Sequence, residues 1–239
     1  MKQRITYLAV LLIAVLPCSA QFRAGIKGGA NLSQVNMNIN GIELDSYDTR
    51  TGAHAGFMAE YMFSKHLGLH AELGYFNSGA NINPEQFKRW FDVSEDVSLS
   101  GHLSMHTIQL PLYLKTKLAI TPQVQVYLMG GGLATYALKG EMFEKLSLPG
   151  ESPLKISWSL YEEKVQILDQ ESTNIHMQQK LNLGLAAEAG VELSNGITIG
   201  IGFRQVLNNM AAISISDGWQ VVTPKTDMWT ANLSVGYWF

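Results

Sequence analysis

The sequence from Trp229 to Phe239 alternates strictly between two kinds of side chain. One face is apolar, and the other is small or polar apart from one tryptophan: Trp229, Ala231, Leu233, Val235, Tyr237 and Phe239 against Thr230, Asn232, Ser234, Gly236 and Trp238. Because successive side chains of a β-strand point to opposite sides, the pattern predicts a strand with a different solvent on each face. It fits an edge strand of a soluble sheet or the closing strand of a transmembrane β-barrel.

The same alternation recurs along the chain, which predicts eight strands. They are expected at residues 22–33, 52–63, 67–78, 105–118, 123–138, 180–193, 197–206 and 230–239. Short connections at 64–66, 119–122 and 194–196 alternate with long ones at 34–51, 79–104, 139–179 and 207–227. Asn195-Gly196 suits a tight hairpin, since both residues tolerate positive φ. Short turns at one end and long loops at the other are typical of an outer-membrane barrel.

The charged residues of the predicted strands fall on one face. They are Arg23, Lys27, Glu60, Glu72, Lys115, Lys117, Glu188, Glu192 and Arg204. Side chains just fill the interior of an eight-stranded barrel, where these cations and anions can pair. A soluble lipocalin-like barrel would place its apolar face inside. Here the charged face fills the lumen, so the apolar face points outward. In water it would form a continuous apolar belt of the kind that soluble monomers avoid. We therefore predict an all-β fold, an eight-stranded antiparallel up-and-down transmembrane β-barrel, closed and surrounded by lipid.

Residues 1–20 have the pattern of a secretory signal peptide. Lys2 and Arg4 precede an apolar run, which ends in small residues suited to cleavage after Ala20. The run is too short to span a bilayer. We expect residues 21–239 to form one outer-membrane barrel domain. A lipoprotein beginning at Cys18 is the alternative, and Pro17 directly before it disfavours that reading.

Composition limits the remaining chemistry. The only cysteine lies in the predicted signal peptide, so no disulfide or thiolate metal site is expected in residues 21–239. A formal net charge of -3 gives no reason to expect a nucleic-acid partner.

Histidines suggest two kinds of site. His54, Glu60, His70 and Glu72 fall on the inner faces of neighbouring strands, where they form either a metal site or part of the charge network. A lipid-modifying enzyme would instead use residues near the predicted outer rim: His102, His106 and His176 with Ser100 and Ser104. The chain has no G-x-S-x-G or H-E-x-x-H motif and no paired cysteines, so we expect no enzyme, no cofactor and no metal.

Two of the long loops carry structural signals. Asn83-Pro84 predicts the start of a helix bearing Phe87, Trp90 and Phe91, which either dock a partner or cover the barrel mouth. The 139–179 connection alternates apolar residues at Ile156, Trp158, Leu160, Val165 and Ile167. This predicts that the fifth and sixth strands extend past the membrane as a hairpin, with an edge open to strand addition.

Three segments resemble the PorT-like outer-membrane β-barrel proteins of the Bacteroidota. They are G-I-K-G-G-A-N-L-S at 25–33, A-E-L-G-Y at 71–75 and, most specifically, I-Q-L-P-L-Y-L-K at 108–115. The final residues Leu233, Val235, Tyr237 and Phe239 are similar to the signal that the barrel-assembly machinery recognises. The resemblance implies an eight-stranded barrel in the outer membrane and, for the family's namesake, a link to protein secretion.

The sequence favours a monomeric barrel with a side-chain-filled lumen that binds through its outer loops. The expected contacts are outer-membrane lipid, the barrel-assembly machinery during insertion, and an envelope protein, a secretion protein or an external ligand. Two alternatives remain: a small pore, which needs the lumen charges to line a water path, and the lipid-modifying enzyme.

Overall fold

A computed structural model describes residues 22–39, 42–44, 47–85, 98–147, 153–161, 179–210 and 225–239. These residues form one antiparallel sheet. Its strands are β1 (Phe22–Ile39), β2 (Ile42–Leu44), β3 (Tyr47–Met62), β4 (Leu67–Ile82), β5 (Ser98–Thr121), β6 (Val124–Ser147), β7 (Leu154–Ser159), β8 (Leu181–Leu193), β9 (Ile197–Val206) and β10 (Lys225–Trp238). The predicted signal peptide, His176 and the loop aromatics Phe87, Trp90 and Phe91 lie outside the described residues.

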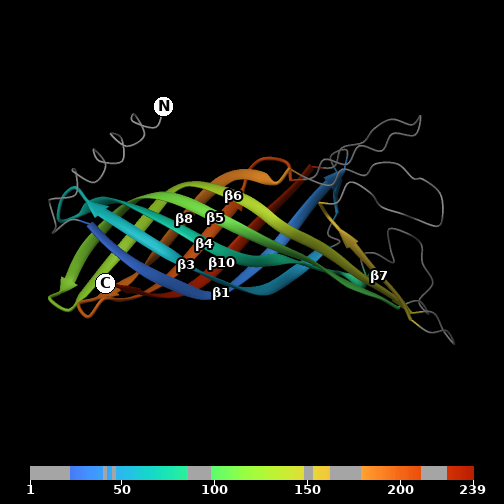
Figure 1. The fold of residues 1–239 in the computed structure, drawn as a ribbon, viewed down its shortest axis with the longest axis horizontal. Helices are drawn as coiled ribbons and strands as arrows, with labels where there is room; N and C mark the ends of the chain where they lie inside the picture. The colour runs from blue at the N-terminus through green and yellow to red at the C-terminus, as the bar shows by residue number, and fades with distance from the viewer. Residues whose placement is uncertain are drawn as a thin grey trace, which may run out of the picture.

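The longer strands close into a ring (Figure 1). Pairing runs from β1 through β3, β4, β5, β6, β8, β9 and β10, and β10 pairs with β1 again. The closing contact is long, from Gly25 opposite Trp238 to Asn38 opposite Lys225. The prediction of an eight-stranded antiparallel barrel is confirmed. Closure leaves none of these eight strands with an unpaired edge along the ring, as a spanning sheet requires.

The outer face of the ring is apolar along its middle. Leu112 and Leu185 are each 56% exposed there, and Ile201 is 66% exposed. Tyrosine and phenylalanine side chains border this belt at both ends: Phe22, Tyr61, Phe63, Tyr237 and Phe239 at one end, and Tyr75, Tyr136 and Phe203 at the other. Aromatic residues at the two margins of an apolar band are typical of a barrel that crosses a bilayer. Among the described residues, no helix is long and apolar enough to cross a membrane.

One end of the ring carries the tight turns. The β8–β9 turn contains Gly196 at φ 89°, a conformation that glycine adopts without strain. Asn195 accepts a hydrogen bond from the backbone N–H of Ile197 at 3.2 Å through its side-chain oxygen. The end of β10 lies at the same end of the barrel (Figure 1), and the N–H of Phe239 donates to the carbonyl of Ala24 at 2.9 Å.

The long connections are shorter than predicted, because strands continue through much of them. β5 begins at Ser98 rather than at 105, and β6 runs to Ser147 rather than to 138. The predicted hairpin in the 139–179 connection is confirmed for its first arm, because β6 extends to Ser147 and pairs with β7 from the same connection. Its returning arm is a separate strand rather than a continuation of the sixth predicted strand, since β8 begins only at Leu181. On its other side the extended part of β6 pairs with β5. The beginning of β5 (98–106), the end of β6 (139–147) and β7 (154–159) together are called the outer extension below (Figure 1).

The polarity of the two faces of β5 reverses where the outer extension begins, although the odd-numbered residues face inward on both sides of this point. A bulge between His106 and Thr107 shifts the register of β5 against β6. Before the bulge in the chain, Leu103 and Met105 are buried inside, whereas after it Leu110 and Leu112 are exposed outside. The apolar side therefore changes from inner to outer face, as expected where the surroundings change from water to lipid.

Candidate functional site

The interior of the barrel brings together all nine charged residues predicted for the lumen. Each is joined to an opposite charge by an ion pair of 2.9 Å or less. Arg23 is the most accessible, with 31% of its side chain exposed at the turn end. The other eight side chains are no more than 7% exposed.

The residues nearest the turns form the turn-side cluster, which consists of Arg23, Glu60, Lys115, Lys117 and Glu192. Glu60 is its centre, because it pairs with Arg23 at 2.7 Å, Lys117 at 2.6 Å and Lys115 at 2.8 Å. Glu192 accepts from Arg23 at 2.5 Å and from Lys117 at 2.9 Å. Three cations thus share two carboxylates.

Aromatic rings stabilise the additional positive charge of this cluster. The ammonium of Lys115 lies 4.3 Å from the ring centre of Tyr127 and 5.2 Å from that of Trp238. The guanidinium of Arg23 lies 4.7 Å from the Trp238 ring. A cation over an aromatic face is attracted by the ring's electron density, most strongly where water is excluded.

Deeper in the barrel, Lys27, Glu72, Glu188 and Arg204 form the mid-barrel cluster. Lys27 bridges Glu72 at 2.7 Å and Glu188 at 2.6 Å. Arg204 donates to Glu72 and to the side-chain oxygen of Gln109, both at 2.8 Å. The Tyr127 hydroxyl donates to Glu188 at 2.9 Å. Two cations and two carboxylates balance here, so the buried charges are compensated.

An apolar plug lies inside the other end of the barrel. It is formed by Val35, Ala80, Leu103, Met105, Leu160, Val206, Met210 and Met228, all buried. Leu160 and Met210 come from connections rather than barrel strands, so segments of the loops fold back into the mouth. This plug was not predicted from the sequence, although Leu103 and Met105 alternate with Ser104 and His106 at this position.

Little space remains between these layers. A cavity lined by Lys27, His70, Lys115, Tyr127 and Glu188, among others, has a volume of about 10 Å³. That volume corresponds to roughly one water molecule. At the turn end, an open vestibule of about 390 Å³ reaches Arg23, Glu192 and Trp238. The described interior is therefore closed by ion pairs and by apolar packing.

The described residues considered for a metal site do not converge on a common point. His70 contacts Glu72 at 3.1 Å, while Glu60 faces the lysines of the turn-side cluster. His54 stacks on Phe76 with ring centres 4.7 Å apart. Within the described ranges, no group of three or more histidine, cysteine, aspartate or glutamate side chains is arranged to hold a metal ion.

The histidines considered for lipid chemistry lie on the outer face of β5. His106 is hydrogen-bonded to the Tyr75 hydroxyl through Nδ1. His102 stacks on Phe143 with ring centres 4.9 Å apart. Ser104 accepts a hydrogen bond from Arg50 at 3.2 Å. In the part of the chain that the structure describes, neither histidine activates a serine hydroxyl.

The four residues of the predicted assembly signal share the outer face of β10 and the end of the chain. Leu233, Val235, Tyr237 and Phe239 are exposed by 46–75%. The intervening residues Ser234 and Trp238 point to the other face of β10 and are buried in the lumen.

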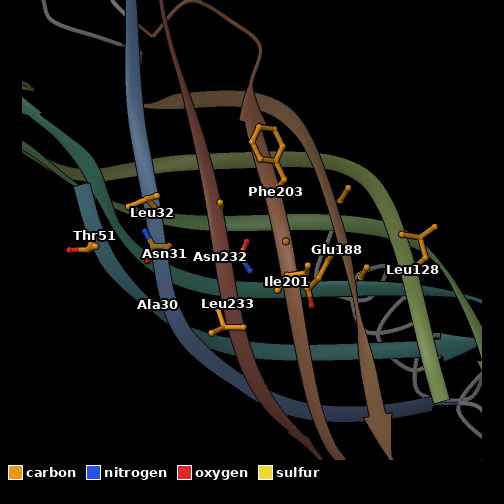
Figure 2. Close-up of a pocket in the computed structure, with 14 residues that line it drawn as sticks. Ala30, Asn31, Leu32, Thr51, Leu128, Glu188, Ile201, Phe203, Asn232 and Leu233 are labelled. Carbon is orange, nitrogen blue, oxygen red and sulfur yellow. The ribbon is translucent and has the colours of Figure 1, made fainter. Parts of the chain in front are cut away.

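A shallow hollow of about 650 Å³ lies on the outer wall (Figure 2). In Figure 2, the side chains of Leu32, Phe203, Leu128 and Leu233 surround it. Its floor is low because small residues lie between them on β1, β8, β9 and β10: Ala30, Ala187, Ala189, Gly202 and Ala231. The hollow lies within the apolar belt, where lipid chains would fill it.

Tyr127 depends on a glycine for its place in the lumen. A Cβ added at Gly200 would lie 2.3 Å from the Tyr127 hydroxyl and 2.6 Å from Glu188 Oε1. We expect Gly200→Ala to break the Tyr127–Glu188 hydrogen bond and to lower the free energy of unfolding by about 1–3 kcal/mol. Urea titration of the barrel in micelles measures this change. Gly132→Ala is the control, because its Cβ would meet nothing within 4 Å; equal effects would contradict the explanation.

Comparison with known proteins gives one family. A family model described as "Outer membrane protein beta-barrel domain" matches residues 17–212. No curated protein matches the sequence.

Solved structures with a similar fold are distant in sequence. The outer membrane protein OprG from Pseudomonas aeruginosa is 15% identical, with a TM-score of 0.49, and the match covers 92% of this chain and 96% of OprG. The outer membrane protein AlkL is 12% identical, with a TM-score of 0.42 and 92% of each chain covered. The outer membrane enzyme PagL is 10% identical, with a TM-score of 0.35, covering 87% of this chain and 98% of PagL.

Proposed function

The chain belongs to the outer membrane protein beta-barrel domain family, and from this premise we propose that it is a non-conducting barrel that binds a ligand or partner through its outer extension. The observation that carries the proposal is the closed lumen, with two ion-pair clusters and an apolar plug in series. A barrel closed in this way offers its outer surface rather than its interior for function.

The outer extension supports the binding role. Barrel strands tilted in a bilayer need only about 9–11 residues to cross it, whereas β5 and β6 each have 24. The excess projects beyond the apolar belt. Among the described strands β7 pairs only with β6, so its other edge can accept an extended segment of a partner.

The finer assignment to the PorT-like proteins is carried by the sequence motifs, above all I-Q-L-P-L-Y-L-K at 108–115. The secretion role of that family's namesake has no support in the fold. We propose instead a partner in the cell envelope or an external ligand, a signal peptide cleaved after Ala20, and recognition of the last strand by the assembly machinery.

Conductance measurement tests the closed lumen. We expect the purified protein, inserted into planar bilayers, to show no unitary channel, because buried ion pairs leave no continuous water path. A general porin inserted under the same conditions is the positive control. Regular channel openings by the folded protein would contradict the proposal and favour the small pore.

A second experiment tests the binding role. The tagged protein and a variant with a shortened 139–179 connection are crosslinked in native outer membranes and purified. We expect a stoichiometric protein or glycolipid with the full-length chain and its loss with the variant. Equal recovery from both would place binding elsewhere on the molecule.

A further inference from the structure

The outer extension carries a second hollow, of about 580 Å³, on its outward face. Strand alternation turns seven of its lining residues outward: Asn81, Ser100, His102, Phe143, Lys145, Lys155 and Ser157. Glu144 also borders the hollow, although it lies on the opposite face of β6. Burial and the charge of Glu144 together raise the pKa of Tyr47. The outward hollow is therefore bordered by cations, hydroxyls, an amide and two aromatic rings.

Two lysines lie directly opposite one another at this hollow. Lys145 on β6 is in register with Lys155 on β7, and both are exposed. Like charges in directly opposed positions destabilise a sheet. Nearby, Lys139 is paired with Glu141 at 2.7 Å, but within the described residues no carboxylate forms an ion pair with Lys145 or Lys155. An anion between the two ammonium groups would remove the repulsion.

The aromatic part of the hollow lies next to the lysines. His102 and Phe143 stack with an interplanar angle of 26°. Partial burial and the nearby Arg50 lower the pKa of His102, so its ring is neutral at neutral pH. The positive charge of the site therefore comes from the lysines. A neutral aromatic surface beside hydroxyl and amide groups suits the apolar face of a sugar ring, whose own hydroxyls need polar partners.

Position decides which lipid could reach this hollow. Leu138, 52% exposed, is the outermost aliphatic side chain of the apolar belt on β6, and Phe143 lies five residues further along the strand. At about 3.4 Å per residue and a tilt of about 40°, the separation is roughly 10–15 Å along the membrane normal. Phospholipid headgroups extend only about 5–8 Å beyond the hydrocarbon on each side. A lipid can fill this hollow only if it carries an extended saccharide.

We propose that the outward hollow binds an anionic saccharide of an outer-leaflet glycolipid, with a sugar ring on His102 and Phe143 and a phosphate or carboxylate between Lys145 and Lys155. The outward face of the extension continues the lipid-facing wall, so a glycolipid beside the barrel presents its sugars to it. The inference rests on the proposed function, because it assumes that the extension lies outside the membrane.

The test uses the full-length protein in nanodiscs and measures lipid retention by native mass spectrometry. The probes are lipopolysaccharide with phosphorylated core sugars, a truncated form lacking the core, phosphatidylglycerol and inorganic phosphate. We expect the wild-type protein to bind the complete form. The double variant Lys145→Gln with Lys155→Gln should bind it at least about tenfold more weakly, since two charge-assisted contacts are lost. The matched control is Lys225→Gln, an exposed lysine at the start of β10.

Three outcomes would overturn the proposal. Equal binding of the truncated form or of phosphatidylglycerol would show that headgroup charge is sufficient. Equal weakening by Lys225→Gln would show unspecific attraction to the basic surface. Absence of binding by a folded, non-conducting barrel would remove the saccharide site while leaving the closed barrel intact; channel activity would instead remove the proposed function.

Discussion

Replacing Glu60 with glutamine is expected to lower the free energy of unfolding by about 3–5 kcal/mol, the cost of leaving buried charges without their partner. Glutamine keeps the size of the side chain, so the effect isolates the charge. Arg23 and Lys117 would keep Glu192, but Lys115, 2% exposed, pairs with Glu60 alone among the described carboxylates. Its ammonium would be left with the rings of Tyr127 and Trp238.

Reversible urea unfolding in micelles or vesicles measures this loss, and tryptophan fluorescence follows it because Trp238 contacts the cluster. Glu141→Gln is the control, since it removes a carboxylate from a partly exposed pair with Lys139 outside the lumen. An exposed pair contributes less than about 1 kcal/mol. If both variants unfolded at the same urea concentration, the lumen pairs would not be a main source of stability.

A charge introduced on the apolar belt should destabilise the barrel by an amount similar to the loss of a lumen carboxylate. Leu112 lies near the middle of the belt and is 56% exposed. We expect Leu112→Arg to destabilise the folded barrel in vesicles by about 2–4 kcal/mol, the cost of a cation near the bilayer midplane. In a soluble protein, a charge at such an exposed position would cost little.

The control for this experiment is Gln123→Arg, in the exposed turn between β5 and β6. It adds the same side chain where water is available, and we expect no measurable change. The fraction of each variant that folds in vesicles gives a second measure. It is read from gels, because an unheated folded barrel migrates differently from the unfolded chain. Equal yields for Leu112→Arg and Gln123→Arg would mean that the apolar face does not contact lipid.

The membrane-spanning part of the fold could be predicted because one physical rule governs each of its strands. Lipid outside and a narrow lumen inside divide alternate residues, so Glu60 and Tyr61 already identify their faces in the sequence. The tight turns were also predictable, since Asn195-Gly196 has the local chemistry of a hairpin. The faces of the nine charged residues follow from the same alternation.

The outer extension was predicted only in part: the hairpin in the 139–179 connection was expected, but the earlier start of β5 at Ser98 was not. Beyond the bulge at His106 and Thr107 the outer face meets water, so the inward-facing positions of β5 carry the apolar residues Leu103 and Met105 instead of polar ones. A strand predicted from one fixed set of apolar positions therefore stops near the bulge, although β5 continues. The alternation from Ile156 to Leu160 was expected to continue into the sixth predicted strand, whereas β7 is a separate strand that ends at Ser159.

The sequence by itself determined the number of strands in the barrel ring, the inner and outer faces and the lumen charges, because these depend on side-chain period and solvent alone. Tertiary structure decided which charges meet: Glu60 and Lys115 are far apart in sequence but join at 2.8 Å. It also placed Leu160 and Met210 in the apolar plug and Lys145 opposite Lys155. Ring closure and register set these contacts, and both depend on the whole set of strand pairings rather than on any single segment.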